Sequence, residues 1–249
     1  MATRAHYFQI NAQEEQSMLN ACSSGDIRAL EQLLKKHGVQ GGNNTGNLPF
    51  DQTATADGPA KLNTISLSIH TLLEKAVAAR QLAVVKLILQ TCPAILLTHG
   101  HGVVHTVLEA PDSDILQELC AHDHTFASFS VDHGMRSFLT DACALPPAQA
   151  VPILHILLDN NADVNDGCGP GGGALYAAIR GGQPVEIVSR ILSKTKTVSG
   201  SHGILGIRRG DADIVRELFS SEATNRKLRV EECIEEAKKT EDEEIIKVV

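Results

Sequence analysis

The chain has few aromatic residues from which to build a core. Its 249 residues include no Trp, two Tyr and six Phe, whereas hydrophobic residues make up 43% of the sequence. The core must therefore be aliphatic and come from Leu, Ile, Val and Ala side chains. Aliphatic side chains of this kind suit thin layers of helices.

An excess of positive charge and long apolar runs are also missing. The formal net charge is -8 at pH 7, which argues against the attraction to phosphate that a general nucleic-acid binder needs. No stretch approaches the roughly eighteen apolar residues of a membrane span, and the first residues lack the apolar centre of a signal peptide. We therefore expect no nucleic-acid partner, no membrane partner, and a cytoplasmic or nuclear protein.

Closely spaced cysteines are absent as well. None of the six forms a CxxC pair, and several fall in segments that should be helical, where a small buried side chain fits. We expect reduced core residues, with a catalytic thiol or a redox pair as the alternatives. The six are Cys22, Cys92, Cys120, Cys143, Cys168 and Cys233.

A pattern that recurs about every thirty residues organises the sequence. Each copy has an apolar segment with small residues, a turn that often contains Gly and Asp, and a second apolar segment. Residues 18–38 read MLNACSSGDIRALEQLLKKHG, and residues 202–220 read HGILGIRRGDADIVRELFS. The helical spacing of the apolar residues predicts a helix, a turn and a second helix in each copy.

One residue in the first helix of each copy marks the register, and we call it the ruler position. It is small in most copies because the two helices of a copy approach each other there. An inserted surface loop, rich in Gly, Asn and Thr, is expected at residues 40–62 between the first two copies. The ruler residues are predicted to be Ala21, Ala76, Val107, Ala142, Ala177, Gly206 and Ala237.

Three stretches give the repeat a family resemblance: GGALYAA at residues 172–178, RRGDADIVRELF at 208–219 and LLDNNADVN at 157–165. The chain resembles the ankyrin repeats, whose period is about 33 residues, although no copy keeps the family's Thr-Pro-Leu-His motif intact. The resemblance implies an all-α ankyrin-repeat solenoid. Six to seven helix-turn-helix repeats with hairpin fingers would fill residues 17–249, after an N-terminal arm of residues 1–16.

The resemblance also implies a binding face. In ankyrin repeats the first helices and the fingers line a concave groove, and the pair after the small residues tends to point into it. This face would be apolar in its middle and basic toward its C-terminal end. The alternative is that the Arg and Lys side chains only solvate exposed helices. The predicted partner-binding residues are Ala78, Ala79, Ala144, Leu145, Ile179, Arg180, Arg208, Arg209, Lys238 and Lys239.

Six of the eleven histidines fall between residues 99 and 133. One interpretation is that they hydrogen-bond to loop backbone. Another is an acid-base site, because histidine exchanges protons near neutral pH. The compact ligand spacing of zinc motifs is missing, so we expect no metal and no cofactor. The candidate catalytic residues, if the chain is an enzyme, are His99, His101, Asp132 and His133.

The sequence therefore predicts a binding module that recognises a protein or peptide partner with acidic and apolar groups. The alternative is a small-molecule-binding protein or a cofactor-independent enzyme of isomerase, cyclase or hydrolase type. Its site would lie between the His-rich fingers and the first helices of the second to fifth repeats.

Overall fold

The computed structural model describes residues 7–39, 65–98, 102–131, 135–167, 173–220 and 230–249. The chain divides into two compact units, Met1–Phe126 and Ala127–Val249, which we call the N-terminal and C-terminal units. The described residues of both units are mostly helical, which confirms the all-α prediction. None of the described helices has both the length and the apolar composition that a membrane span requires.

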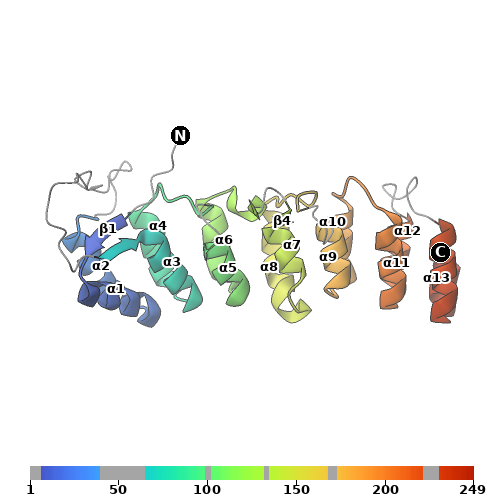
Figure 1. Ribbon diagram of the computed structural model, residues 1–249, viewed down its shortest axis with the longest axis horizontal. Coiled ribbons are helices and arrows are strands. Elements are labelled where there is room, and N and C mark those ends of the chain that lie inside the picture. Colours follow the sequence, from blue (N-terminus) through green and yellow to red (C-terminus); the bar gives the residue numbers. More distant parts are fainter. Residues whose placement is uncertain (1–6, 40–64, 99–101, 132–134, 168–172, 221–229) are drawn as a thin grey trace. The chain divides into compact units, whose positions relative to one another are not determined.

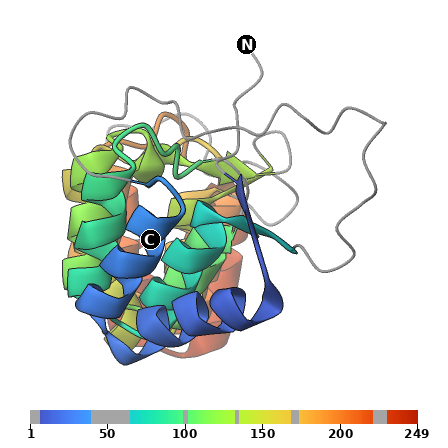
Figure 2. The ribbon, with the colours of Figure 1, turned by 90° about the vertical axis from the view of Figure 1, so that its left-hand side faces the viewer.

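In the N-terminal unit, the described helices form three pairs, which we call layers 1 to 3 (Figure 1). The first helices of successive layers pack on each other, as do the second helices. Figure 2 faces layer 1, whose two helices are drawn in blue at the front. The layers are α1 (Ala12–Ser24) with α2 (Ile27–Lys36), α3 (Ile69–Ala78) with α4 (Leu82–Thr91), and α5 (Gly102–Glu109) with α6 (Ser113–His122).

A short antiparallel sheet joins segments of this unit that lie far apart in the sequence. Strand β1 (Tyr7–Ile10) pairs with β2 (Ile65–Ser68), so that Tyr7 lies opposite Ser68 and Ile10 opposite Ile65. The strand β1 leads directly into α1, and β2 leads into α3. The sheet therefore brings together the starts of layers 1 and 2.

In the C-terminal unit, the described helices form four pairs, layers 4 to 7, with the same succession of contacts between first helices and between second helices. A short 3-10 helix, η1 (Phe126–Ser128), is followed by a hairpin of β3 (Ser130–Val131) and β4 (Arg136–Ser137). The layers are α7 (Phe138–Cys143) with α8 (Pro147–Asp159), α9 (Ala174–Arg180) with α10 (Val185–Leu192), α11 (Gly200–Arg209) with α12 (Ala212–Ser220), and α13 (Val230–Thr240) with α14 (Glu243–Val248).

Polar caps and left-handed residues set the ends of these helices. Asn11 and Glu14 form a capping box at the start of α1. The helix therefore begins within residues 1–16, the predicted N-terminal arm. At two turns within layers a glycine with positive φ is followed by a capping aspartate: Gly25 with Asp26, and Gly210 with Asp211. Glycine adopts this conformation without the steric cost that a Cβ brings. The predicted Gly-Asp turn is confirmed at both places.

The core is aliphatic, as the composition predicts. Its buried residues are mainly Leu, Ile, Val and Ala, with Phe126 and Phe138 as the large rings among the described residues. The five described cysteines are free and buried, which confirms them as core residues, whereas Cys168 lies outside the described residues. Burial raises the pKa of the Cys143 thiol to about 12, so this thiol stays protonated at neutral pH.

The structure corrects the predicted register of layer 5 by one residue. In layers 1 and 2 the backbone carbonyl of the ruler residue accepts a hydrogen bond from the backbone N–H five positions later, as Asp26 donates to Ala21 and Gln81 to Ala76. In layer 5, Gln183 donates to Ala178. The ruler residue of α9 is therefore Ala178 and not Ala177. With this register, Ile179 lies one position after the ruler residue and is buried. The residues at the same position in layers 1, 2, 4 and 6 are buried too: Cys22, Val77, Cys143 and Ile207.

The inserted loop predicted at residues 40–62 lies outside the described residues. The other predicted ruler residues are all buried. At Gly206 a Cβ would lie 3.1 Å from Cδ1 of Leu218 on α12 and 3.6 Å from Cγ2 of Val215. The two helices of layer 6 thus approach each other at the ruler position, as expected.

Replacing Gly206 by Leu should destabilise the chain by about 1–3 kcal/mol, because the added side chain overfills the contact with α12. Gly206→Ala should have a much smaller effect, because alanine favours the helix and the end of Leu218 can move. Urea unfolding followed by circular dichroism measures both changes. Glu217→Leu on the exposed side of α12 is the control. An equal loss in Glu217→Leu and Gly206→Leu would contradict close packing at the ruler position.

Candidate functional site

The predicted partner-binding residues lie in three environments. Ile179 is buried, with 1% of its surface exposed. Three residues are partly buried: Ala79, Leu145 and Arg209. The remaining six are exposed: Ala78, Ala144, Arg180, Arg208, Lys238 and Lys239.

Two of the ten predicted residues, Ile179 and Lys238, occupy a different position in the repeat from the others because of register. Ile179 directly follows the ruler residue Ala178, at a position that packs in the core. Lys238 directly follows the ruler residue Ala237 and occupies the same position in layer 7, although its side chain is exposed there. The residue of layer 7 that corresponds to Arg208 is Lys239.

The corrected register gives one row of exposed residues along the first helices of the C-terminal unit. The row lies two positions after each ruler residue, where each first helix ends or nearly ends. We call it the exit row, and it consists of Ala144, Arg180, Arg208 and Lys239, from layers 4 to 7 in that order. It keeps the predicted order, from a small apolar residue to basic ones.

Arg209 contacts the layer that precedes it. Its guanidinium donates to the backbone carbonyls of Gln183 at 2.9 Å, Gly182 at 3.0 Å and Ile179 at 3.3 Å. These carbonyls lie at the end of α9 and in the turn that follows. The last carbonyls of a helix have no partner within the helix and carry partial negative charge. Arg209 satisfies them from the next layer.

Gln183 makes the same kind of contact between layers 4 and 5. Its side chain is fully buried, and Nε2 donates to the carbonyls of Cys143 at 2.9 Å and Leu145 at 2.8 Å. Close approach of the two layers is possible because residue 181 is glycine. A Cβ there would lie 2.1 Å from the carbonyl oxygen of Cys143. The partly buried Leu145 therefore presents its carbonyl to Gln183.

Two cations of the exit row share one carboxylate. Nε of Arg208 donates to Glu236 Oε1 at 2.7 Å, and Nζ of Lys239 donates to Oε2 at 2.9 Å. These two contacts, that of Arg208 first, lower the pKa of Glu236 to about 2. The group keeps a net charge of +1 at neutral pH. Arg180 forms no ion pair with any described residue, so positive charge remains along the row.

An aromatic residue that the sequence did not single out adjoins the row. Tyr176 on α9 is half-buried, and its ring meets that of His202 on α11 edge to face, with centroids 6.1 Å apart. Nδ1 of His202 accepts a hydrogen bond from the backbone N–H of Ser199 at 3.0 Å. Burial lowers the pKa of His202, which keeps the ring neutral at neutral pH. Tyrosine beside arginine is common in binding surfaces.

Two described histidines, His122 and His70, contact the backbone of the loop after α4. His122 Nε2 lies 3.3 Å from the carbonyl oxygen of Ile95, and His70 Nε2 lies 2.9 Å from that of Leu96. These contacts agree with the interpretation that histidines here hydrogen-bond to loop backbone. The candidate catalytic residues His99, His101, Asp132 and His133 lie outside the described residues. Within the described ranges, no group of His, Cys, Asp and Glu is arranged to hold a metal ion.

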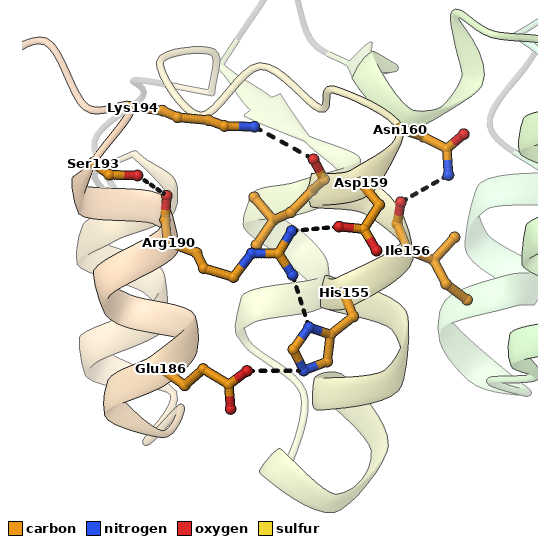
Figure 3. A network of polar contacts seen from close by, with 9 residues as sticks. His155, Ile156, Asp159, Asn160, Glu186, Arg190, Ser193 and Lys194 are labelled. Carbon is orange, nitrogen blue, oxygen red and sulfur yellow. Dashed lines mark hydrogen bonds and ion pairs between the residues drawn. The ribbon is translucent and has the colours of Figure 1, made fainter.

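A polar network joins the second helices of layers 4 and 5 (Figure 3). Arg190 on α10 donates to Nδ1 of His155 at 2.7 Å and pairs with Asp159, both on α8. Because a guanidinium can only donate, Nδ1 accepts this bond. Nε2 of His155 faces Glu186 at 3.9 Å, and Nζ of Lys194 reaches the carbonyl of Leu158. The network connects layers 4 and 5 through their second helices. It does not involve the exit row, which belongs to the first helices.

Arg209→Ala should lower the free energy of unfolding by about 1–3 kcal/mol, because partly buried carbonyls lose their donors. Arg209→Lys should recover only part of the loss, since a compact ammonium cannot replace the forked guanidinium. Urea unfolding measures both. Arg180→Ala, which removes the same side chain from an exposed position one layer earlier, should change the stability by less than about 0.5 kcal/mol. Equal effects of Arg180→Ala and Arg209→Ala would contradict the contact between layers.

Glu236 should remain ionised as the pH falls to about 3, because its pKa is lowered from the ordinary 4.5 to about 2. Since the folded pKa is the lower one, the stabilising effect of this carboxylate is present above its unfolded pKa and is lost as the pH falls toward 2. Arg208→Ala should raise the Glu236 pKa more than Lys239→Ala does. Carbon-13 NMR of the side-chain carboxyl measures each midpoint. An unchanged midpoint in Arg208→Ala would show that the ion pair does not form in solution.

The interpretation of this site rests on the internal repeat of the chain. The exit row and its register come from layers of this chain that can be aligned with one another. The ankyrin resemblance likewise rests on residues of this sequence. No family model matches the chain, and no curated protein matches it.

Proposed function

We propose that the chain is an ankyrin-like repeat protein that binds a protein or peptide partner along the exit row of its C-terminal unit. The observation that carries this proposal is a contrast between adjacent positions. The residue one position after the ruler is buried in layers 4 to 6, as Cys143, Ile179 and Ile207. The next residue is exposed in layers 4 to 7 and changes from Ala to Arg, Arg and Lys. Packing accounts for the first position but leaves the second free for recognition.

The charge of the row favours a partner with carboxylates. Arg180 has no ion-pair partner among the described residues, and Arg208 is 64% exposed while it contacts Glu236. An arginine fork can hold a second carboxylate in two parallel hydrogen bonds. These charges act at the surface of an otherwise acidic chain, so they attract acidic partners locally.

The small residue at the start of the row favours an apolar contact there. Ala144 is exposed and has no long side chain that could cover the surface around it. Tyr176, half-buried on α9, adds a ring near the arginines. The proposed ligand is therefore an extended or helical peptide with apolar residues toward layer 4 and acidic residues toward layers 5 to 7.

The test is selection of short peptides from a random display library by the full chain. The wild-type protein should enrich peptides that combine aliphatic residues with Asp or Glu. The triple variant Arg180→Ala/Arg208→Ala/Lys239→Ala should lose this enrichment. Binding of a selected peptide should weaken as salt is raised, because exposed charges are screened.

The control removes the same number of exposed positive charges from the N-terminal unit. Arg28→Ala/Lys35→Ala/Lys86→Ala changes three exposed residues on second helices and should leave the enrichment intact. If the wild-type protein selects no acidic peptides, or if both triple variants lose them equally, the proposal is refuted.

A further inference from the structure

Glu236 is a carboxylate of the chain itself that lies within the exit row. Its side chain is only 15% exposed, because its two oxygens accept from Nε of Arg208 at 2.7 Å and from Nζ of Lys239 at 2.9 Å. An acidic side chain of a partner would use the same donors. Glu236 therefore occupies the basic end of the row in the way that a ligand carboxylate would.

The turns of layers 5 to 7 allow this contact to be compared from one layer to the next. In each of these layers the residue four positions after the ruler has a positive φ. This shared feature aligns the three first helices with one another. The residues with positive φ are Gly182, Gly210 and Glu241.

The alignment explains why Arg208 has an internal partner and Arg180 does not. Arg208 of layer 6 contacts Glu236, the residue directly before the ruler of layer 7. The residue in the equivalent place beside Arg180 is Leu205, directly before the ruler of layer 6. Leucine has no carboxylate, and Arg180 forms no ion pair with a described residue. An acidic ligand thus meets an arginine without an internal carboxylate at layer 5 and a partly neutralised pair of cations at layers 6 and 7.

Tyr176 adds a second donor at layer 5. It lies four residues before Arg180 on α9, so the two side chains share one side of the helix. Its half-buried ring is held against His202 of the next layer, and a tyrosine hydroxyl can donate to a carboxylate. Layer 5 therefore offers a guanidinium and a hydroxyl to the same acidic group.

We propose that Glu236 determines where the exit row holds an acidic ligand. It competes for Arg208 and Lys239 from within the chain, and so places the principal carboxylate of the ligand at Arg180, beside Tyr176. This inference rests on the proposed peptide-binding function and specifies its register. The competition is limited in strength, because ion pairs at a surface contribute little. Further acidic residues of a ligand can share Arg208 and Lys239 with Glu236, but they gain less there than at Arg180.

The test uses the peptide that the wild-type full chain enriches most from the random display library. Fluorescence anisotropy of the labelled peptide gives its dissociation constant for each variant. Arg180→Ala should raise the dissociation constant at least about tenfold, because the charged fork that holds the carboxylate is lost. Arg208→Ala should raise it by less than about threefold, since Glu236 already occupies this side chain. Glu236→Gln should lower it by about two- to fivefold, because both cations are then available to the ligand.

A double variant separates competition from a general change of charge. If Glu236 competes for Arg208, the loss caused by Arg208→Ala should be larger in the Glu236→Gln background than in the wild-type background. The matched control is Asp141→Asn. Asp141 lies directly before Ala142 in layer 4, is 21% exposed, and pairs with Arg136 at 2.8 Å instead of with the exit row. This control removes the same charge and should leave the dissociation constant nearly unchanged.

Unchanged or weaker peptide binding by Glu236→Gln would overturn this inference, since Glu236 would then only orient Arg208. Equal gains from Asp141→Asn and Glu236→Gln would overturn it as well. In both cases the wild-type protein still selects acidic peptides, so the proposed function stands. If neither the wild-type protein nor Glu236→Gln enriches acidic peptides, the proposed function and this inference both fail. Circular dichroism checks that each variant remains folded.

Discussion

The stacking of aliphatic faces is the interaction on which every layer depends. A single pair of short helices buries too little apolar surface to be stable alone, so each pair needs its neighbour. In layer 6, Ile207 and Val215 are covered by residues of layer 7. This constraint fixes the positions that contact a neighbouring layer and leaves others unconstrained. The exit row consists of such unconstrained positions, which is why its side chains can vary from layer to layer.

Polar contacts between layers complement this packing. Arg209 and Gln183 reach back to carbonyls at the end of the preceding first helix, and Arg190 reaches back to His155 and Asp159 of the preceding second helix. Hydrogen bonds form only over a narrow range of distance and angle. These side chains therefore help to fix the position of one layer on the next.

The sequence was sufficient to predict the helix pairs, the aliphatic core and most ruler residues, because these follow from helical periodicity. It was not sufficient to choose between the adjacent alanines Ala177 and Ala178, which are equally small. The choice depends on the turn with two glycines that follows. The exposure of Arg180 and Arg208 agrees with the prediction. The role of Arg209 was missed, because its acceptors are backbone atoms of residues about thirty positions earlier, and such acceptors leave no pattern in the side chains.

The pairing of β1 with β2 has a consequence for the order of folding. Most contacts join each layer to the next one in the sequence, and such contacts form quickly. Ile10 instead pairs with Ile65, so layer 1 joins layer 2 only after a long intervening segment has been closed. The entropy lost in closing a loop grows with its length. Layers that follow one another closely can therefore assemble first, and the N-terminal strand and its helix pair add to a preformed stack.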